Sequence, residues 1–173
     1  KTPLAVISNE LNAKDKTLVN QVQLMKKQID RYLKKAHLDS VGKVAKEKIN
    51  VIELSQKMVR IFTKLYPNKD IKMVTKEKGA FVLSSMEDME EVIGNIVENS
   101  CKWAEKKVDL TVKITDENQV HLIFSDDGPG LPQDKMKKVF ARGFRLDEQT
   151  PGTGLGLNIV KDIVETCKGN VWL

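Results

Sequence analysis

The sequence predicts an α+β domain, in which helices cover one face of a mixed β-sheet, preceded by an antiparallel helical hairpin. Three observations support this prediction. Apolar residues recur at helical spacing in the first part of the chain, up to Ala36. Beyond residue 48, segments with strand periodicity alternate with segments of helix periodicity. Near the end, two strong strands are followed by a stretch rich in glycine and proline and then by a closing helix, which is typical of a two-layer α+β sandwich.

The predicted hairpin occupies residues 1–38. Its second helix carries an apolar stripe with alternating steps of four and three: Leu18, Val22, Met25, Ile29, Tyr32 or Leu33, and Ala36. A similar stripe precedes it, with a polar turn between the two at residues 12–17. Because a lone hairpin cannot bury both of its faces, we expect a symmetric homodimer that forms a four-helix bundle.

A short linker is predicted at residues 39–48, where helical periodicity is lost and Asp39-Ser40-Val41-Gly42 is typical of a hinge. The second domain is then expected at residues 49–173. Its first helix is capped by Asn50 and runs toward Leu65, before Pro67. Short strands at 71–75 and 81–84 lie on either side of a turn at Lys78-Gly79.

The second half of this domain begins with a long helix capped by Ser85. Its predicted buried face consists of Met89, Val92, Ile93, Ile96 and Val97. Strands follow at 108–114, which alternates, and at 120–124, which is almost continuously apolar. A closing helix runs from about Gly154 to Cys167. These elements complete the predicted sandwich.

Composition excludes several classes of protein. Of 173 residues, 40% are hydrophobic and 31% charged, as in an ordinary globular protein, and no stretch approaches the roughly 20 apolar residues of a membrane span. Residues 1–48 carry a net charge of +6 and the other 125 residues sum to −1, which together give the +5 of the chain. The lysines of the first part occupy a helix face without interleaved aromatics, so no nucleic acid is expected. The two histidines and two cysteines lack metal-ligand spacing, and zinc is not expected.

The first motif with chemical potential lies late on the long helix. Asn95 and Asn99 are four residues apart, so their amides project from one helix face. Amide oxygens suit Mg²⁺, which keeps most of its water and takes further ligands from phosphates. Lys102, near the same face, supplies a positive charge for a phosphate. A polar stripe on an amphipathic helix is the alternative explanation of these residues.

The second motif is Asp126-Asp127-Gly128-Pro129-Gly130, directly after a strand. Asp126 is suited to accept the exocyclic N–H of a purine, while Gly128 and Gly130 leave room for the ring. A tight turn would also satisfy this pattern.

Two further motifs complete the series. In the third, Arg142 and Arg145 are three residues apart beside apolar anchors, which suggests a hinged lid that brings guanidinium groups to phosphates.

The fourth motif, Pro151-Gly152-Thr153-Gly154-Leu155-Gly156-Leu157, opens an apolar helix, and backbone N–H groups at such a helix start bind anions. It fits neither a Walker loop, since no Gly-Lys-Ser/Thr follows, nor a dinucleotide fingerprint, since Leu157 replaces the third glycine.

In this order the four motifs resemble the N, G1, F and G2 boxes of the ATP-binding domain of bacterial sensor histidine kinases. The resemblance covers the chain from about Val44 and extends to a superfamily with DNA gyrase B subunits and MutL-type repair proteins. It implies a Bergerat-type fold and Mg²⁺ and ATP as cofactors. It also implies an ATP site with Asn99 as Mg²⁺ ligand, Asn95 beside it, phosphates held by Lys102, Arg142, Arg145 and the backbone of Gly152, Thr153, Gly154, Leu155, Gly156 and Leu157, and adenine read by Asp126 with Gly128 and Gly130. Trp103 stands where the family usually has a tyrosine, and at this place the Trp103 ring would stack on the nucleotide.

The resemblance includes the start of the chain. Lys1-Thr2-Pro3-Leu4 is similar to the end of the H-box, which places the phosphoacceptor histidine just before Lys1 and Thr2 four positions after it. A threonine there orients water for dephosphorylation of the partner, or it merely caps the turn before Pro3. His37 and His121 lack this context, and we expect structural roles for them. The family usually continues beyond Leu173, so we also expect truncation at the C-terminus.

The resemblance implies a protein-histidine kinase. The γ-phosphoryl group of ATP passes to a histidine and then to an aspartate in the receiver domain of a response regulator, with a possible phosphatase activity. The chain would be the cytoplasmic portion of a membrane-anchored sensor, without direct membrane contact itself. Asn95 stands where the hydrolases of the superfamily carry a catalytic glutamate, which favours a kinase. The alternatives are an ATP-driven clamp, a serine kinase of the anti-sigma type, or a non-catalytic module that dimerises, binds nucleotide and docks a regulator.

Overall fold

The computed structural model describes residues 46–136, 138–141, 144 and 154–173. The chain divides into two units, Lys1–Ser40 and Val41–Leu173, and every described residue belongs to the second unit. Several expectations therefore lie outside the described residues and stay predictions: the helical hairpin, most of the linker, Thr2, His37, Arg142, Arg145, Gly152 and Thr153.

The described residues form helices and strands in mixed order. In chain order these are β1 (Glu47–Asn50), α3 (Val51–Leu65), β2 (Asp70–Thr75), β3 (Phe81–Ser84), α4 (Met86–Trp103), β4 (Lys107–Ile114), β5 (Val120–Asp126), α5 (Gln133–Met136) and α6 (Gly156–Thr166). Two helix starts agree with the sequence prediction. The Asn50 side chain accepts the Ile52 N–H at 3.2 Å, and Ser85 Oγ accepts the Asp88 N–H at 3.1 Å. These caps satisfy N–H groups that the first turn of a helix leaves unpaired.

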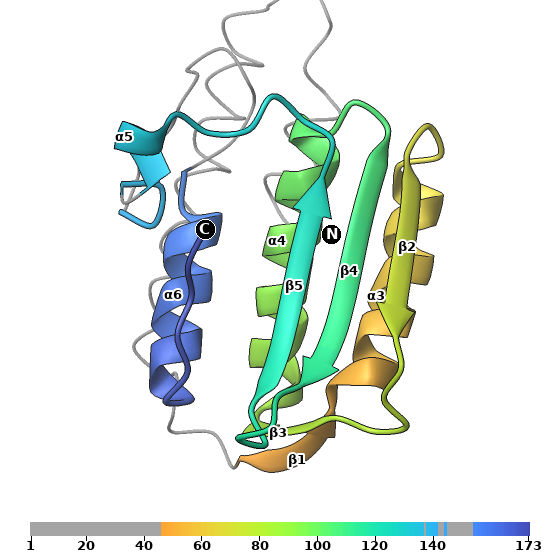
Figure 1. Cartoon of the computed structure of the whole chain (residues 1–173), viewed down its shortest axis with the longest axis vertical. Coiled ribbons are helices and arrows are strands. Elements are labelled where there is room, and N and C mark those ends of the chain that lie inside the picture. The colour runs from red at the N-terminus through yellow and green to blue at the C-terminus, as the bar shows by residue number, and fades with distance from the viewer. Residues whose placement is uncertain (1–45, 137, 142–143, 145–153) are drawn as a thin grey trace, which may run out of the picture. The chain divides into compact units, whose positions relative to one another are not determined.

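The main sheet is mixed and has the order β2-β4-β5. Strand β4 is parallel to β2, with Ile71 opposite Val108, and antiparallel to β5, with Ile114 opposite Val120. Helices α3 and α4 cover one face of this sheet, and α6 packs beside α4 (Figure 1). The predicted mixed sheet with helices on one face is therefore confirmed.

The core fills the space between the sheet and its helices. Alternate residues of β4 point into it and are completely buried, namely Val108, Leu110 and Val112. Ile93 and Val97 of α4 meet them and are equally buried. Burial of each such side chain contributes roughly 1.5–3 kcal/mol, so this layer holds α4 firmly on the sheet. The predicted buried face of α4 is confirmed except at Ile96, which is only partly buried.

Strands β2 and β3 belong to different sheets, although the sequence places them around one turn. Strand β3 pairs antiparallel with β1, a strand that the sequence did not predict, and Ile49 lies opposite Val82. Strand β1 begins within the predicted linker. The chain at its start is tied to the end of α6, because Lys46 Nζ donates to the Thr166 carbonyl at 3.1 Å.

The ends of other helices and strands differ from the predicted ends by only a few residues. Helix α6 begins at Gly156 and ends at Thr166, a shorter span than predicted. Strand β5 continues two residues past Phe124, because its backbone pairs with β4 as far as Asp126. The last residue of β5 is therefore the aspartate on which the second motif depends.

Candidate functional site

The first motif and the fourth motif meet in the structure. Asn95, on α4, donates from Nδ2 to the Glu91 carbonyl at 2.8 Å, which fixes the orientation of its amide. Its Oδ1 then lies 3.0 Å from the position that a Cβ at Gly156 would occupy. A glycine at the first position of α6 thus allows that helix to begin directly against Asn95. Asn99, one turn further along α4, is also partly buried.

Lys102 forms an ion pair on α4 itself. Its Nζ lies 2.7 Å from Oε1 of Glu98, and the two side chains are 33% and 46% exposed. Tyr66, which ends α3, lies near this pair: burial raises the pKa of Tyr66, and the Glu98 carboxylate raises it further. The predicted phosphate-binding cation is therefore held by a neighbouring acid.

Asp126 lies exposed at the end of β5, at the start of a turn that packs on α4. Its Oδ1 accepts the Gly128 N–H at 3.1 Å. A Cβ at Gly128 would lie only 2.6 Å from the Trp103 carbonyl oxygen and 2.8 Å from Asp126 Oδ1. The absence of a side chain at Gly128 therefore allows the turn to pack against the end of α4, and the role of Gly128 beside a purine ring stays a prediction. Gly130 has a φ of +71° and open space around it.

Sequence reasoning missed the role of Asp127. Its Oδ1 accepts the N–H groups of Lys106 and Lys107, both at 2.9 Å, and these bonds hold the pKa of Asp127 below its usual value. The bonds attach the turn after β5 to the start of β4. The sequence gave no signal that the second of two consecutive aspartates would bind the backbone at the start of β4.

Lys69 is a second residue whose role sequence reasoning missed, and it binds the segment between α4 and β4. Its Nζ donates to the Ala104 carbonyl at 2.5 Å and to the Glu105 carbonyl at 3.2 Å. A cation at the carbonyl end of α4 also opposes the negative end of the helix dipole. Lys69 thus holds the end of α4 on which Trp103 lies, 36% exposed, and Asp127 holds the start of the strand that follows.

The start of α6 is suited to bind an anion. No described side chain caps it, and its first turn contains no acidic residue. Gly154 has a φ of +67°, while Leu155 is buried and anchors the helix start in the core. Backbone N–H groups at such a helix start are suited to bind an oxygen-rich ligand. Of the third motif, Val139 is buried and Phe140 is partly buried, so the segment before Arg142 is anchored.

The donor chemistry fits a magnesium nucleotide. The amide oxygens of Asn95 and Asn99 are hard, neutral ligands, and the described residues contain no cluster of three or more His, Cys, Asp or Glu able to hold a metal. An ion at this place would take most of its ligands from water and phosphate, which is how Mg²⁺ binds with nucleotides.

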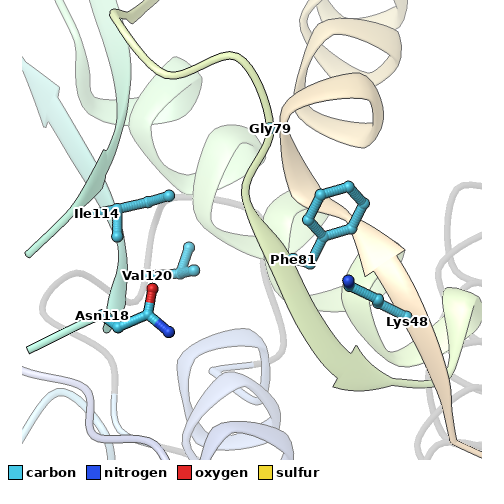
Figure 2. A pocket seen from close by; sticks show the side chains of 6 residues that line it. All are labelled: Lys48, Gly79, Phe81, Ile114, Asn118 and Val120. Carbon is cyan, nitrogen blue, oxygen red and sulfur yellow. The ribbon is translucent and has the colours of Figure 1, made fainter.

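A separate hollow of about 300 Å³ lies at the other end of β5, between the β1–β3 ribbon and the β4–β5 turn (Figure 2). Its lining consists of Lys48, Gly79, Phe81, Ile114, Asn118 and Val120. Lys48 Nζ lies 4.5 Å from the centre of the Phe81 ring. None of the predicted site residues lines this hollow. The candidate site lies elsewhere, where α4, α6 and the turn after β5 meet.

The fold therefore brings the first, second and fourth motifs together at the second half of α4, an arrangement that is typical of a nucleotide-binding domain. Residues 85–173, which carry all four motifs, match the family described as histidine kinase-, DNA gyrase B-, and HSP90-like ATPase. The chain belongs to this family, and its described unit is an ATP-binding domain of the bacterial sensor histidine kinase type.

Individual relatives agree with this assignment. The chain is 30% identical to the virulence sensor histidine kinase PhoQ of Salmonella typhimurium over 184 residues, which cover 99% of this chain and 37% of that protein. It is equally similar to the sensor protein PhoQ of Escherichia coli, with the same shares covered. The solved catalytic domain of the histidine kinase ThkA is 25% identical, with a TM-score of 0.67 over 75% of this chain and 86% of that one.

The chain thus spans about 37% of the length of the curated relatives it matches. In the part of the chain that the structure describes, no helix combines the length and apolar character that a membrane crossing requires.

Proposed function

We propose that this domain binds Mg·ATP and transfers the γ-phosphoryl group to a histidine imidazole, from which it passes to an aspartate in the receiver domain of a response regulator. One observation carries the proposal: α6 begins against Asn95, and the Asp126 turn packs on Trp103, so that three of the four motifs meet along the second half of α4. The names of the relatives as sensor histidine kinases support the direction of the reaction.

Each motif has a defined part in this proposal. Asn99, with Asn95 beside it, holds the metal, which when bound neutralises phosphate charge. Asp126 accepts the adenine amine through its carboxylate, with Gly128 and Gly130 beside it, and Trp103 stacks on the nucleotide. The phosphates are met by cationic side chains and by backbone N–H groups: Lys102, Arg142, Arg145, Gly152, Thr153, Gly154, Leu155, Gly156 and Leu157. Positioning and charge neutralisation of this kind account for most of the catalysis in phosphoryl transfer.

Two side chains favour transfer to a protein group over hydrolysis. Asn95 occupies the place where a hydrolase would need a carboxylate to activate water, and an amide cannot accept the proton. Glu98 is the acid nearest to Asn99 in sequence, but its side chain points about 100° away from Asn99 around the helix. Neither of these two side chains therefore serves as a base for water beside the proposed phosphate site.

The proposal extends to the setting of the whole protein. The chain would act as a homodimer through the helical hairpin at residues 1–38, on the cytoplasmic side of a membrane-anchored sensor, and dock a response regulator. Phosphatase activity toward that regulator is part of the same proposal and is assigned to Thr2.

Nucleotide binding is tested most directly by calorimetry with ATP and ADP. Asp126→Asn should abolish binding or weaken it strongly, because an amide NH₂ would face the adenine amine donor. Asn99→Ala should leave the base pocket intact and remove the dependence of affinity on Mg²⁺. Asp116→Asn, an exposed change at the opposite end of β5, serves as the matched control and should bind like the unchanged protein. Unchanged affinity in Asp126→Asn would sink the assignment of the adenine pocket.

A further inference from the structure

The Glu98–Lys102 ion pair lies inside the proposed site and is not explained by the roles above. At about 100° per residue, Lys102 lies roughly 20° from the direction of Asn95 around the helix, while Glu98 lies roughly 60° from Asn95 on the side opposite Asn99. Lys102 therefore stands between the asparagine row and Glu98. A flexible lysine side chain in this place reaches either the phosphates beside the asparagines or the carboxylate of Glu98.

In the structure Lys102 is bound to the carboxylate, with Nζ and Oε1 2.7 Å apart. An ammonium group that leaves this partner for a phosphate must first break the ion pair. Both side chains are partly exposed, so water screens the pair and the free-energy cost of breaking it is small. A ligand shifts such an equilibrium only by its differential interaction with the two states, and polyphosphate supplies more negative charge than one carboxylate.

We propose that Glu98 is a positioning residue that holds Lys102 away from the phosphates and so sets the affinity of the site for ATP. The inference rests on the proposed function. Lys102 exchanges Glu98 for phosphate when the nucleotide binds, and the cost of that exchange weakens ATP binding. Nucleosides carry no phosphate and do not bind Lys102, so their affinity is independent of Glu98.

The test compares Glu98→Gln with the unchanged chain by calorimetry, using Mg·ATP and adenosine as ligands. Loss of the carboxylate frees Lys102, so the Kd for ATP should fall by about two- to five-fold, which corresponds to the free energy of an exposed ion pair. The Kd for adenosine should stay the same. Glu90→Gln is the matched control, because Glu90 lies on the same helix and pairs with Lys57, also at 2.7 Å. It should leave ATP affinity unchanged.

A second pair of variants separates positioning by Glu98 from simple repulsion between its charge and ATP. In a Lys102→Met background, Glu98→Gln should no longer change ATP affinity, since Glu98 acts only through Lys102. A gain of the same size in that background would overturn the proposal in favour of direct repulsion. Unchanged or weaker ATP binding in the single variant Glu98→Gln would also overturn it. Failure of the unchanged chain to bind ATP would refute the proposed function instead.

Discussion

Ser55 is a polar residue in an apolar place. It lies on α3 with 0% of its surface exposed, and its Oγ has no hydrogen-bond partner among the described residues. A buried hydroxyl without a partner loses its bonds to water and gains nothing in return. We expect Ser55→Ala to raise the free energy of unfolding by about 0.5–1 kcal/mol, measured by urea denaturation.

Ser85→Ala is the matched comparison, with the same change at another buried serine. Here Oγ caps α4 through the Asp88 N–H, so its removal should lower the free energy of unfolding by about 1 kcal/mol. Opposite signs in the two variants would show that the partner, not the residue type, decides the effect. Destabilisation in both would mean that Ser55 has a bond within the folded chain.

The two glycines after Asp126 should respond differently to alanine. At Gly128 a Cβ would lie 2.6 Å from the Trp103 carbonyl, a backbone atom that cannot move without shifting α4. At Gly130 there is space, and only the positive φ opposes the change, at roughly 1–2 kcal/mol. We expect Gly128→Ala to cost more than Gly130→Ala in thermal melts. The reverse order would show that the turn is not packed on α4.

Residues of the site could be predicted only as far as their neighbours in sequence define them. The spacing of Asn95 and Asn99 places both on one helix face whatever the fold. The contact between Asn95 and Gly156 joins residues 61 positions apart, and no local pattern signals it. The glycines of the fourth motif looked equivalent for this reason, although Gly156 has a packing role of its own.

At the scale of elements, Asp127 links the turn after β5 to the start of β4, and this link should depend on pH. The Lys106 and Lys107 N–H groups lower the pKa of Asp127 in the folded chain. Its contribution to stability is therefore fully present above the unfolded pKa of about 3.9 and is lost as the pH falls through the lower, folded value. Asp127→Asn keeps an acceptor oxygen but cannot ionise.

The measurement is the difference in unfolding free energy between the unchanged chain and Asp127→Asn, followed from pH 7 downward. The unchanged chain should be the more stable at neutral pH, and its advantage should shrink once the pH passes below about 4. A difference that stays constant to pH 2 would contradict the assignment of these bonds to the ionised carboxylate.

Elements with local signals were predicted well, and those defined by distant partners were not. Helices α3 and α4 carry capping residues, and β4 alternates along its length. Strand β1 has four residues, of which only Ile49 is buried, so its pattern contains no periodicity to detect. Its partner β3 lies more than 30 residues away. The separation of β2 and β3 into two sheets likewise depends on those partners, not on the turn between them.

For the whole molecule, the proposed reaction requires an acceptor. We expect residues 1–173 alone to take up no acid-labile label from γ-labelled ATP. A chain extended by the proposed acceptor helix should take up such label. Phosphoimidazole is acid-labile, so stability of the label to acid distinguishes it from a phosphoserine. Acid-labile label on the printed chain that disappears in His37→Gln or His121→Gln would place the acceptor within it. His121 has a structural contact already, since its ring lies 5.7 Å from that of Trp172.

The phosphatase proposal is tested in the same extended chain. If Thr2 stands four residues after the acceptor, its hydroxyl lies one helical turn along the same face and orients a water. Thr2→Ala should then lose regulator dephosphorylation and keep autophosphorylation, both followed with labelled phosphate. Parallel loss of the two activities would indicate a folding defect, and full retention of the phosphatase would leave Thr2 a structural residue.

The bond from Lys46 to Thr166 relates the start of β1 to the proposed site. It connects the residue before β1 to the last residue of α6, and the first residue of that helix lies against Asn95. An α-helix of 11 residues is a stiff rod about 16 Å long. The contact with Lys46 and the proposed phosphate site therefore lie at opposite ends of one helix, about 16 Å apart along its axis.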